Sequence, residues 1–373
     1  MVEKEPLQVA ASRTAVYFPE LQGKRLGLMV NHTSMVNGVH LVDTLLASGM
    51  LVDVVFAPEH GFRGDADAGA VIGDGVDDKT GVRLLSLYGG KYKPDPEDLA
   101  SLDLVIFDIQ DVGARFYTYV SSMTYLMEAC AEQGIPFMVL DRPNPIGYYV
   151  DGPVLDTAYR SFVGMHPIPV VHGLTVGELA TMINGEGWLK GGVQADLRVV
   201  SCAGYDHQTY YDLPVPPSPN LPNMKAIYLY PSTCFFEGTV ASEGRGTDKQ
   251  FQVYGHPDFP GGDVSFTPMP MKGAQKPKLE GQLCKGFDLS ALSIDTLRNI
   301  RQVQVEYLID FYQGFPSKDS LFLKNLYLDK LAGGKELREA ILAGNNAAQI
   351  RASWEPELSA YRALRKKYLL YPE

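Results

Sequence analysis

Cysteine is scarce in this chain of 373 residues. The four cysteines lie far apart in the sequence and form no CxxC pair; they are Cys130, Cys202, Cys234 and Cys284. This spacing excludes a zinc ribbon and a thioredoxin-type motif, and it disfavours a disulfide framework in a chain of this length. Cys130 lies in an apolar helical segment, where a buried core thiol is expected.

Positive charge is also in short supply. Lysine and arginine number 33 against 44 aspartates and glutamates, which gives a formal net charge of -11. Nucleic acid is an unsuitable partner for such a chain, because binding it requires a basic face. No apolar run reaches the length of a membrane span, and residues 1–11 are polar. We therefore expect a soluble protein with no membrane span.

The common signatures of nucleotide, serine-hydrolase and metal sites are missing. The sequence contains no GxGxxG, no GxxxxGK[ST], no GxSxG and no HExxH, which argues against NAD, ATP, a nucleophilic serine and a zinc protease site. Asp65-x-Asp67-x-Gly69 resembles a calcium loop, but it lacks a third acidic ligand and has Val76 in place of the closing glutamate. We predict that the protein needs no metal and no cofactor.

The first half of the sequence alternates strand and helix patterns. Short runs rich in β-branched and apolar residues predict strands over 25–30, 51–57, 103–107 and 135–140. Helical periodicity predicts helices over 40–48 and 119–132, the second of them ended by Gly134. Strands that alternate with helices indicate an α/β fold with a doubly wound, mostly parallel, Rossmann-like sheet.

The second half of the sequence has a different pattern. Thr175-Val-Gly-Glu178 has the form of a capping box that opens a helix, whereas residues 202–275 are rich in Pro, Gly and Tyr and predict loops and short strands. Helical periodicity returns over 293–313 and 335–343 and in a final helix from Glu355. We predict a Rossmann-like catalytic domain over 1–240 and a smaller α+β domain over 241–373 that closes the active-site cleft.

Each predicted strand runs into a polar cluster at its C-terminal end. These clusters are Asn31-His-Thr-Ser, Pro58-Glu-His-Gly-Phe-Arg-Gly, Asp108-Ile-Gln-Asp with the nearby Arg115 and Tyr117, and Asp141-Arg-Pro-Asn-Pro. Ligands of open α/β sheets bind outside the carboxyl ends of the strands, so we predict that the four clusters share one cleft. Helix caps and turns explain Asn31 and Asn144 equally well, but they explain Glu59 and Arg142 poorly.

A second group of polar residues lies in the middle of the chain. His172 precedes the capped helix, and Asn220 ends the stiff segment Pro217-Ser-Pro-Asn. Glu237, Glu243 and Arg245 lie among glycines, which let a ligand approach the backbone closely. A plain surface loop is the alternative, although aromatic residues flank the segment.

These strings together resemble the bacterial exo-β-N-acetylmuramidases of peptidoglycan turnover. The resemblance rests on the four strand-end clusters, on Pro217-Ser-Pro-Asn and on Glu237-Gly-Thr followed by Ser242-Glu-Gly-Arg-Gly-Thr, and it runs from about residue 13 onward. It implies a Rossmann-like domain, a smaller second domain, a cleft between them and Glu59 as the leading catalytic residue. Val240-Ala241 departs from the asparagine that the family leads us to expect there.

The chemistry of glycosidases agrees with this resemblance. They need a protonated acid on the leaving oxygen and a second carboxylate as nucleophile or base. Glu59 follows an apolar strand, where partial burial favours a protonated carboxyl. Asp111, Asp108 and Glu243 remain alternatives for the second carboxylate. A sugar-binding protein without catalysis is the rival interpretation of the same residues.

Substrate binding is predicted for the remaining polar residues. An arginine fork suits the lactyl carboxylate of muramic acid, and Arg63, Arg115, Arg142 and Arg245 are the candidates. The full set of predicted substrate-binding residues is Asn31, His32, His60, Arg63, Asp108, Gln110, Arg115, Tyr117, Asp141, Arg142, Asn144, His172, Asn220, Glu237 and Arg245. The expected partner is a small carbohydrate, a muramic acid glycoside. Such a substrate favours an extracytoplasmic location if a signal peptide has been removed.

Overall fold

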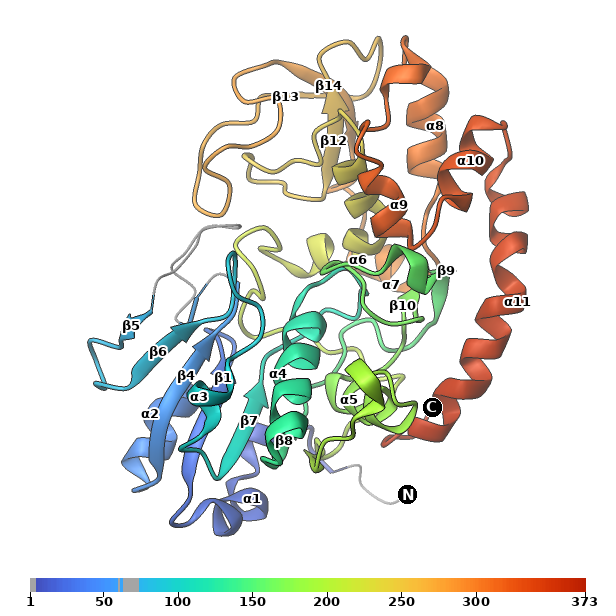
Figure 1. The fold of residues 1–373 in the computed structure, drawn as a ribbon. Helices are drawn as coiled ribbons and strands as arrows, with labels where there is room; N and C mark the ends of the chain where they lie inside the picture. The colour runs from blue at the N-terminus through green and yellow to red at the C-terminus, as the bar shows by residue number, and fades with distance from the viewer. Residues whose placement is uncertain (1–4, 60, 63–73) are drawn as a thin grey trace.

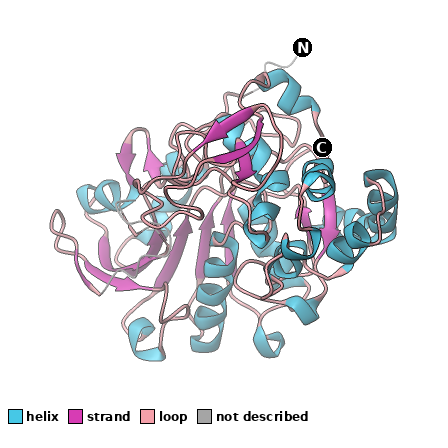
Figure 2. Cartoon of the chain, turned by 90° about the horizontal axis from the view of Figure 1, so that it is seen from above, coloured by secondary structure: helices cyan, strands magenta, loops and turns pink. Residues whose placement is uncertain are grey.

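The computed structural model of the chain describes residues 5–59, 61–62 and 74–373. Within these residues, a seven-stranded sheet forms the lower half of the molecule in Figure 1, and a three-stranded antiparallel sheet with several helices lies above it. The strands of the larger sheet run side by side in the view from above (Figure 2). The fold is therefore α/β, with a smaller second part over the large sheet, as the sequence predicts.

The large sheet contains all four strands expected from the sequence. In spatial order its strands are β11 (Leu197–Val200), β8 (Phe137–Leu140), β7 (Leu104–Asp108), β1 (Arg25–Val30), β4 (Leu51–Ala57), β6 (Arg83–Ser86) and β5 (Gly75–Val76). Neighbouring strands are parallel except β5, which pairs antiparallel with β6. The sequence pattern did not reveal β5, β6 and β11, which are short or only partly buried.

Helices cover both faces of this sheet. They are α1 (Thr14–Leu21) and α2 (Leu41–Ala47) on one face, and α3 (Pro96–Leu99), α4 (Tyr119–Gln133) and α5 (Val176–Gly185) on the other. Leu26 and Leu28 of β1 pack in one hydrophobic core with Leu45 of α2, whereas Met29 packs in the other with Met123 of α4. Side chains of a strand alternate between faces, so β1 serves both cores.

The order of the strands creates a crevice beside β1. The chain leaves β1 for β4 on one side and later returns to β7 on the other side. Connections that diverge from neighbouring parallel strands leave a gap at the carboxyl ends, and this gap is where open α/β sheets bind ligands. The polar cluster that begins at Asn31 follows β1, and the cluster that ends at Asp111 follows β7. Both lie at this edge of the sheet, as does the cluster after β4.

The remainder of the chain adds hairpins, a small sheet and helices. The hairpins are β2 (Met35–Val36) with β3 (Val39–His40), and β9 (Asp151–Val154) with β10 (Pro169–Val171). The antiparallel sheet has the order β12 (Val253–His256), β14 (Cys284–Asp288) and β13 (Val264–Phe266). The helices are α6 (Met224–Thr233), α7 (Ile294–Asn299), α8 (Glu306–Gly314), α9 (Tyr327–Ala332), α10 (Glu336–Leu342) and α11 (Ala347–Arg365).

Three expectations for this half were wrong in detail. The segment predicted as loops and short strands contains α6, whose first turn is capped by Asn223 accepting from the amide of Ala226. The helix expected over 293–313 is two helices, α7 and α8. The last helix begins at Ala347, not Glu355, because Asn346 and Gln349 form a capping box there. Pro356 lies inside α11 without ending it.

The residues after α11 return to the large sheet. The Tyr371 hydroxyl donates to Asp141 Oδ2 at 2.6 Å and accepts from the Cys202 amide at 2.8 Å. The amide of His207 donates to the carbonyl of Pro372 at 2.9 Å. α11 runs along the outer side of the molecule from the upper half to the lower half (Figure 1), so it carries these residues to the end of β8.

Candidate active site

A pocket of about 690 Å³, counting the solvent at its mouth, opens above the carboxyl end of the large sheet. The walls come from segments that are far apart in the sequence: they include Glu59, Tyr88, Tyr117, Thr118, Tyr119, Asn220, Glu237, Arg245, Phe251 and Tyr327. Both halves of the chain thus contribute to one pocket.

Glu59 enters the pocket from the loop that follows β4. Its carboxyl is held by two hydroxyl groups: Tyr88 contacts Oε1 at 2.8 Å and Thr118 contacts Oε2 at 2.9 Å. The Tyr119 hydroxyl lies 3.3 Å from the carbonyl oxygen of Glu59. Thr118 and Tyr119 begin α4, which packs on the sheet, so a rigid element fixes this side of the carboxyl. Because hydroxyls can donate or accept, the contacts suit a protonated or an ionised carboxyl.

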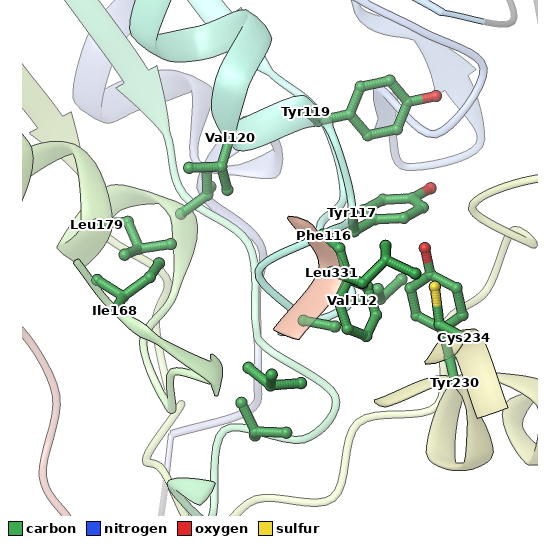
Figure 3. Packing of buried hydrophobic residues seen from close by; sticks show 14 of the residues in the cluster. Val112, Phe116, Tyr117, Tyr119, Val120, Ile168, Leu179, Tyr230, Cys234 and Leu331 are labelled. Atoms are coloured by element: carbon green, nitrogen blue, oxygen red, sulfur yellow. The ribbon is translucent and has the colours of Figure 1, made fainter. Parts of the chain in front are cut away.

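Aromatic rings form the floor of the pocket. Tyr117 packs edge-on against Tyr119, with ring centroids 5.0 Å apart, and Phe116 packs edge-on against Tyr230 at 5.1 Å. Figure 3 shows Tyr117, Phe116 and Tyr230 gathered on one side of the start of α4. Burial and the nearby Glu59 raise the pKa of Tyr88, so this phenol keeps its proton at neutral pH. Rings of this kind suit the apolar faces of a sugar.

Glu237 lines the pocket from the second half of the chain and is held by a cation. Arg245 Nη2 and Nε donate to its Oε1 at 2.7 Å and 3.2 Å. The Arg245 guanidinium also lies over the ring of Phe251, 5.1 Å from its centroid. Among the described residues, no group accepts a hydrogen bond from Arg245 Nη1. The arginine is therefore fixed in place and keeps hydrogen-bonding capacity at the pocket wall.

Glu243 lies behind Arg245 and is not part of the pocket wall. It is buried, with Lys278 Nζ at 2.9 Å and Arg245 Nε at 3.5 Å from its carboxylate oxygens. Burial alone would raise the pKa of Glu243, but the charges of Lys278 and Arg245 outweigh it and hold the pKa below its usual range. Lys278 also donates to the carbonyls of Phe236 and Ala241, at 2.9 Å and 2.7 Å, and so ties this loop together.

Asp111 is buried below the pocket. Its Oδ1 accepts from the amide of Gly113 at 2.7 Å, and burial raises its pKa to about 7. His172 Nε2 lies 4.0 Å from the same oxygen, and burial lowers the pKa of this imidazole to about 3. Gln110 donates to the carbonyls of Asp111 and Pro143, each at 2.8 Å. Asp111 and His172 thus form a pair of a protonatable acid and a neutral imidazole, and neither residue lines the pocket.

Several predicted binding residues make contacts inside the protein. Arg142 donates through Nε and Nη2 to the two oxygens of Asp108, at 2.5 Å and 2.9 Å, and both side chains are buried. Asp141 accepts from the Thr175 hydroxyl at 2.7 Å and the Gly177 amide at 2.8 Å, and burial raises its pKa to about 6. These residues connect β7, β8 and the start of α5 beneath the cleft.

Arg115 and its neighbours have similar internal contacts. Arg115 donates to the carbonyls of Pro153, Ile168 and Leu331, at 2.7, 2.6 and 2.8 Å, and burial lowers its pKa to about 9. Asn144 Nδ2 donates to the carbonyl of Leu174 at 2.8 Å.

The Tyr117 hydroxyl donates to the carbonyl of Pro217 at 2.8 Å. Tyr117 nevertheless lines the pocket, which Arg115 and Asn144 do not.

Three more predicted residues lie in the segments after β1 and before α6. Asn31 is buried, and its Oδ1 accepts from the Thr33 amide at 2.9 Å. His32 Nε2 contacts the carbonyl of Pro216 at 2.8 Å. Asn220 lines the pocket; its Nδ2 donates to the Gly273 carbonyl at 2.8 Å, and within the described residues its buried Oδ1 has no hydrogen-bond partner. Asn220 therefore retains an acceptor for a ligand.

Two predicted residues, His60 and Arg63, lie outside the described residues, as does the segment with Asp65 and Asp67. Within residues 5–59, 61–62 and 74–373, no group of three His, Cys, Asp or Glu side chains is arranged to hold a metal ion. The same part of the chain contains no helix with the length and apolar character needed to cross a membrane.

The family models for exo-β-N-acetylmuramidase NamZ match most of the chain. The N-terminal model covers residues 26–225 and the C-terminal model covers residues 228–371. The chain belongs to this family. A curated relative, the peptidoglycan β-N-acetylmuramidase NamZ of Bacillus subtilis strain 168, is 40% identical over an alignment of 382 positions, which covers 95% of this chain and 89% of the relative.

Two crystal structures have the same fold. Both are of DUF1343 family proteins from Bacteroides fragilis NCTC 9343. The first is 47% identical, with a TM-score of 0.92 over 99% of this chain and 100% of that one. The second is 29% identical, with a TM-score of 0.83 over 98% of this chain and 99% of that one. The family resemblance and the two-part α/β fold expected from the sequence are confirmed.

Proposed function

We propose that the protein is an exo-acting glycoside hydrolase that releases terminal N-acetylmuramic acid from peptidoglycan fragments, with Glu59 as its general acid. The Bacillus subtilis relative is named a peptidoglycan β-N-acetylmuramidase and is similar over nearly the whole chain, and the family models carry the description exo-β-N-acetylmuramidase. The observation that carries the assignment of residues is that Glu59 and Glu237 line one pocket in contrasting surroundings. A glycosidase needs two carboxyl groups with different roles.

Glu59 suits the role of acid because only neutral hydroxyls hold its side-chain oxygens in the described structure. Tyr88 and Thr118 position both oxygens without supplying a positive charge that would keep the group ionised. In the bond-breaking step the Glu59 proton passes to the glycosidic oxygen as the bond from that oxygen to the anomeric carbon breaks. Water then supplies the hydroxyl at the anomeric carbon, and its remaining proton restores the acid form of the site.

Glu237 is our candidate for the second carboxylate. Arg245 binds its Oε1 and holds the side chain at the pocket wall, where a carboxylate would stabilise positive charge on the sugar in the transition state. Asp111, Asp108 and Glu243, the partners suggested by the sequence, do not line the pocket, and their catalytic role stays a prediction. Glu243 supports Glu237 indirectly, because it binds the same arginine from behind.

Arg245 is also our candidate for binding the lactyl carboxylate. Of the four arginines considered, Arg115 and Arg142 are buried in internal contacts and Arg63 lies outside the described residues. Arg245 lines the pocket, and its Nη1 has no acceptor among the described residues. A guanidinium that already holds one carboxylate can bind a second through its other edge.

The test compares aryl β-glycosides of N-acetylmuramic acid and of N-acetylglucosamine, which differ by the lactyl group. We expect hydrolysis of the muramic acid compound and much slower hydrolysis of the other. Release of single sugars from one end of a glycan strand, without internal cleavage, checks the exo action. Binding of the muramic acid glycoside with no turnover would instead identify a sugar-binding protein, and equal rates on both compounds would refute lactyl recognition.

A further inference from the structure

A second groove lies beside the active-site pocket. It contains about 970 Å³ of space, counting the solvent at its mouth, and Ser218 lines both cavities. Its apolar wall comes from Val215, Pro216, Pro219 and Pro222 on one side and Met271 on the other. The segment from 215 to 222 is therefore a partition, with the proposed catalytic pocket on one side and the groove on the other.

The groove wall contains a buried amide whose hydrogen bonds are incomplete. Gln250 is 3% exposed; its Nε2 has the thioether of Met271 as a weak acceptor at 3.7 Å, and within the described residues its Oε1 has no donor. A buried amide oxygen without a donor is costly, and native proteins usually satisfy such atoms with a ligand, water or another residue. Met271 is flexible and only partly buried, so a ligand can displace it from the amide.

We propose that this groove binds the second sugar of the glycan, the neutral 2-acetamido sugar that leaves with the rest of the chain. The inference rests on the proposed function: if the pocket holds the terminal muramic acid, the next sugar must lie just outside it. The acetamido group brings an N–H donor for Gln250 Oε1 and a methyl group for the apolar wall formed by Pro216 and Pro219.

The charges at the groove favour a neutral occupant. Among the described residues that line it, Asp248 and Lys272 carry opposite charges, so together they favour neither a carboxylate nor an ammonium group. The arginine-bearing wall of the active-site pocket is different, because Arg245 is positioned there for an anion. The two cavities thus match two successive sugars, one acidic and one neutral.

The experiment compares Gln250→Met with the parent protein on two substrates. One is the disaccharide of N-acetylmuramic acid linked to N-acetylglucosamine, which fills both cavities; the other is an aryl β-muramide, which lacks the second sugar. We expect KM for the disaccharide to rise about tenfold, the factor that corresponds to one lost hydrogen bond. The KM for the aryl glycoside should stay within about twofold. Gln252→Met is the matched control, because Gln252 is equally buried but does not line the groove.

The outcomes separate this inference from the proposed function. Turnover of the aryl muramide by the parent, with equal KM changes or none for the two substrates in Gln250→Met, would overturn the groove assignment alone. Failure of the parent to cleave either substrate would overturn the proposed function and the groove assignment with it. If Gln250→Met does not fold, Met271→Phe gives the same test by filling the groove from a partly exposed position, and it must raise KM for the disaccharide only.

Discussion

The two carboxyl groups of the pocket are held in opposite ways. Glu59, after a strand of the large sheet, is positioned by the neutral hydroxyls of Tyr88 and Thr118. Glu237, from the second half of the chain, is bound by Arg245, which Glu243 holds from behind. The partners of Glu59 are thus uncharged, whereas the partner of Glu237 is a cation. The two halves of the chain thus supply carboxyl groups in different surroundings, which suits the two different roles that a glycosidase needs.

The largest effect is expected when Glu59 loses its acidic proton. Glu59→Gln keeps the shape of the side chain, and we expect kcat for the disaccharide to fall about 10²–10⁴-fold, as is typical when a general acid is lost. For an aryl glycoside with a good leaving group the fall should be much smaller, because that group needs little protonation. Steady-state kinetics on both substrates measure this. An equal loss on both would show that Glu59 has another role.

Glu237→Gln tests the other member of the pair. Its charge supports the sugar cation whatever the leaving group, so we expect kcat to fall on the order of 10²-fold for good and poor leaving groups alike. The comparison variant is Glu243→Gln, which removes the buried carboxylate behind Arg245. A larger loss of kcat in Glu243→Gln than in Glu237→Gln would make Glu243 the second carboxylate.

Asp111 gives a third environment. Its carboxyl is buried, and among the described residues neither a cation nor a hydroxyl donates a hydrogen bond to it. Burial raises its pKa from 3.8 to about 7. As the pH rises, Asp111 therefore ionises in the unfolded chain at a lower pH than in the folded protein. Between about pH 4 and pH 7 the free energy of unfolding falls as the pH rises, because only the unfolded state loses this proton.

Asp111→Asn should remove that dependence. Between pH 4 and pH 5.5 we expect the free energy of unfolding of the parent to fall relative to the variant by about 2 kcal/mol, since one pH unit corresponds to about 1.4 kcal/mol for one proton. Urea unfolding at a series of pH values measures the difference. A constant difference across this range would mean that Asp111 ionises normally in the folded protein.

The smallest effect is expected for Tyr88→Phe. This change removes one hydroxyl contact to Glu59, worth about 1 kcal/mol, so kcat should fall about fivefold with little change in stability. Tyr92→Phe is the control, because the Tyr92 ring packs against Tyr88 but does not line the pocket. If both variants lose the same activity, aromatic packing rather than the hydrogen bond to Glu59 is responsible.

The sequence predicts the four central strands of the large sheet because these strands and the adjacent helix caps are local patterns. The ends of β1, β4, β7 and β8 could be placed from apolar runs, and Gly134 ends α4 with a positive φ of 67°, as a C-terminal glycine should. The same patterns bring Glu59 to the correct edge of the sheet.

Which polar residues face the ligand could not be read from local patterns. Asp108 and Arg142 neutralise each other, a pairing across 34 residues that no spacing rule reveals. Tyr88 follows the short strand β6, and Lys278 lies in a loop, so nothing nearby marked either as a partner of a carboxyl. The missed α6 has a similar cause, because its Pro231 gave the segment the composition of a loop.

The contacts of Tyr371 have a consequence for how the chain is made. Asp141, at the end of β8, receives a hydrogen bond from a residue 230 positions later. During synthesis, residues 1–200 therefore leave the ribosome before the residue that donates this hydrogen bond has been made. A nascent chain arrested after residue 225 should remain more open to protease near β8 than the same segment in the released protein. The surroundings of Asp141 are therefore completed only after residue 371 has been made.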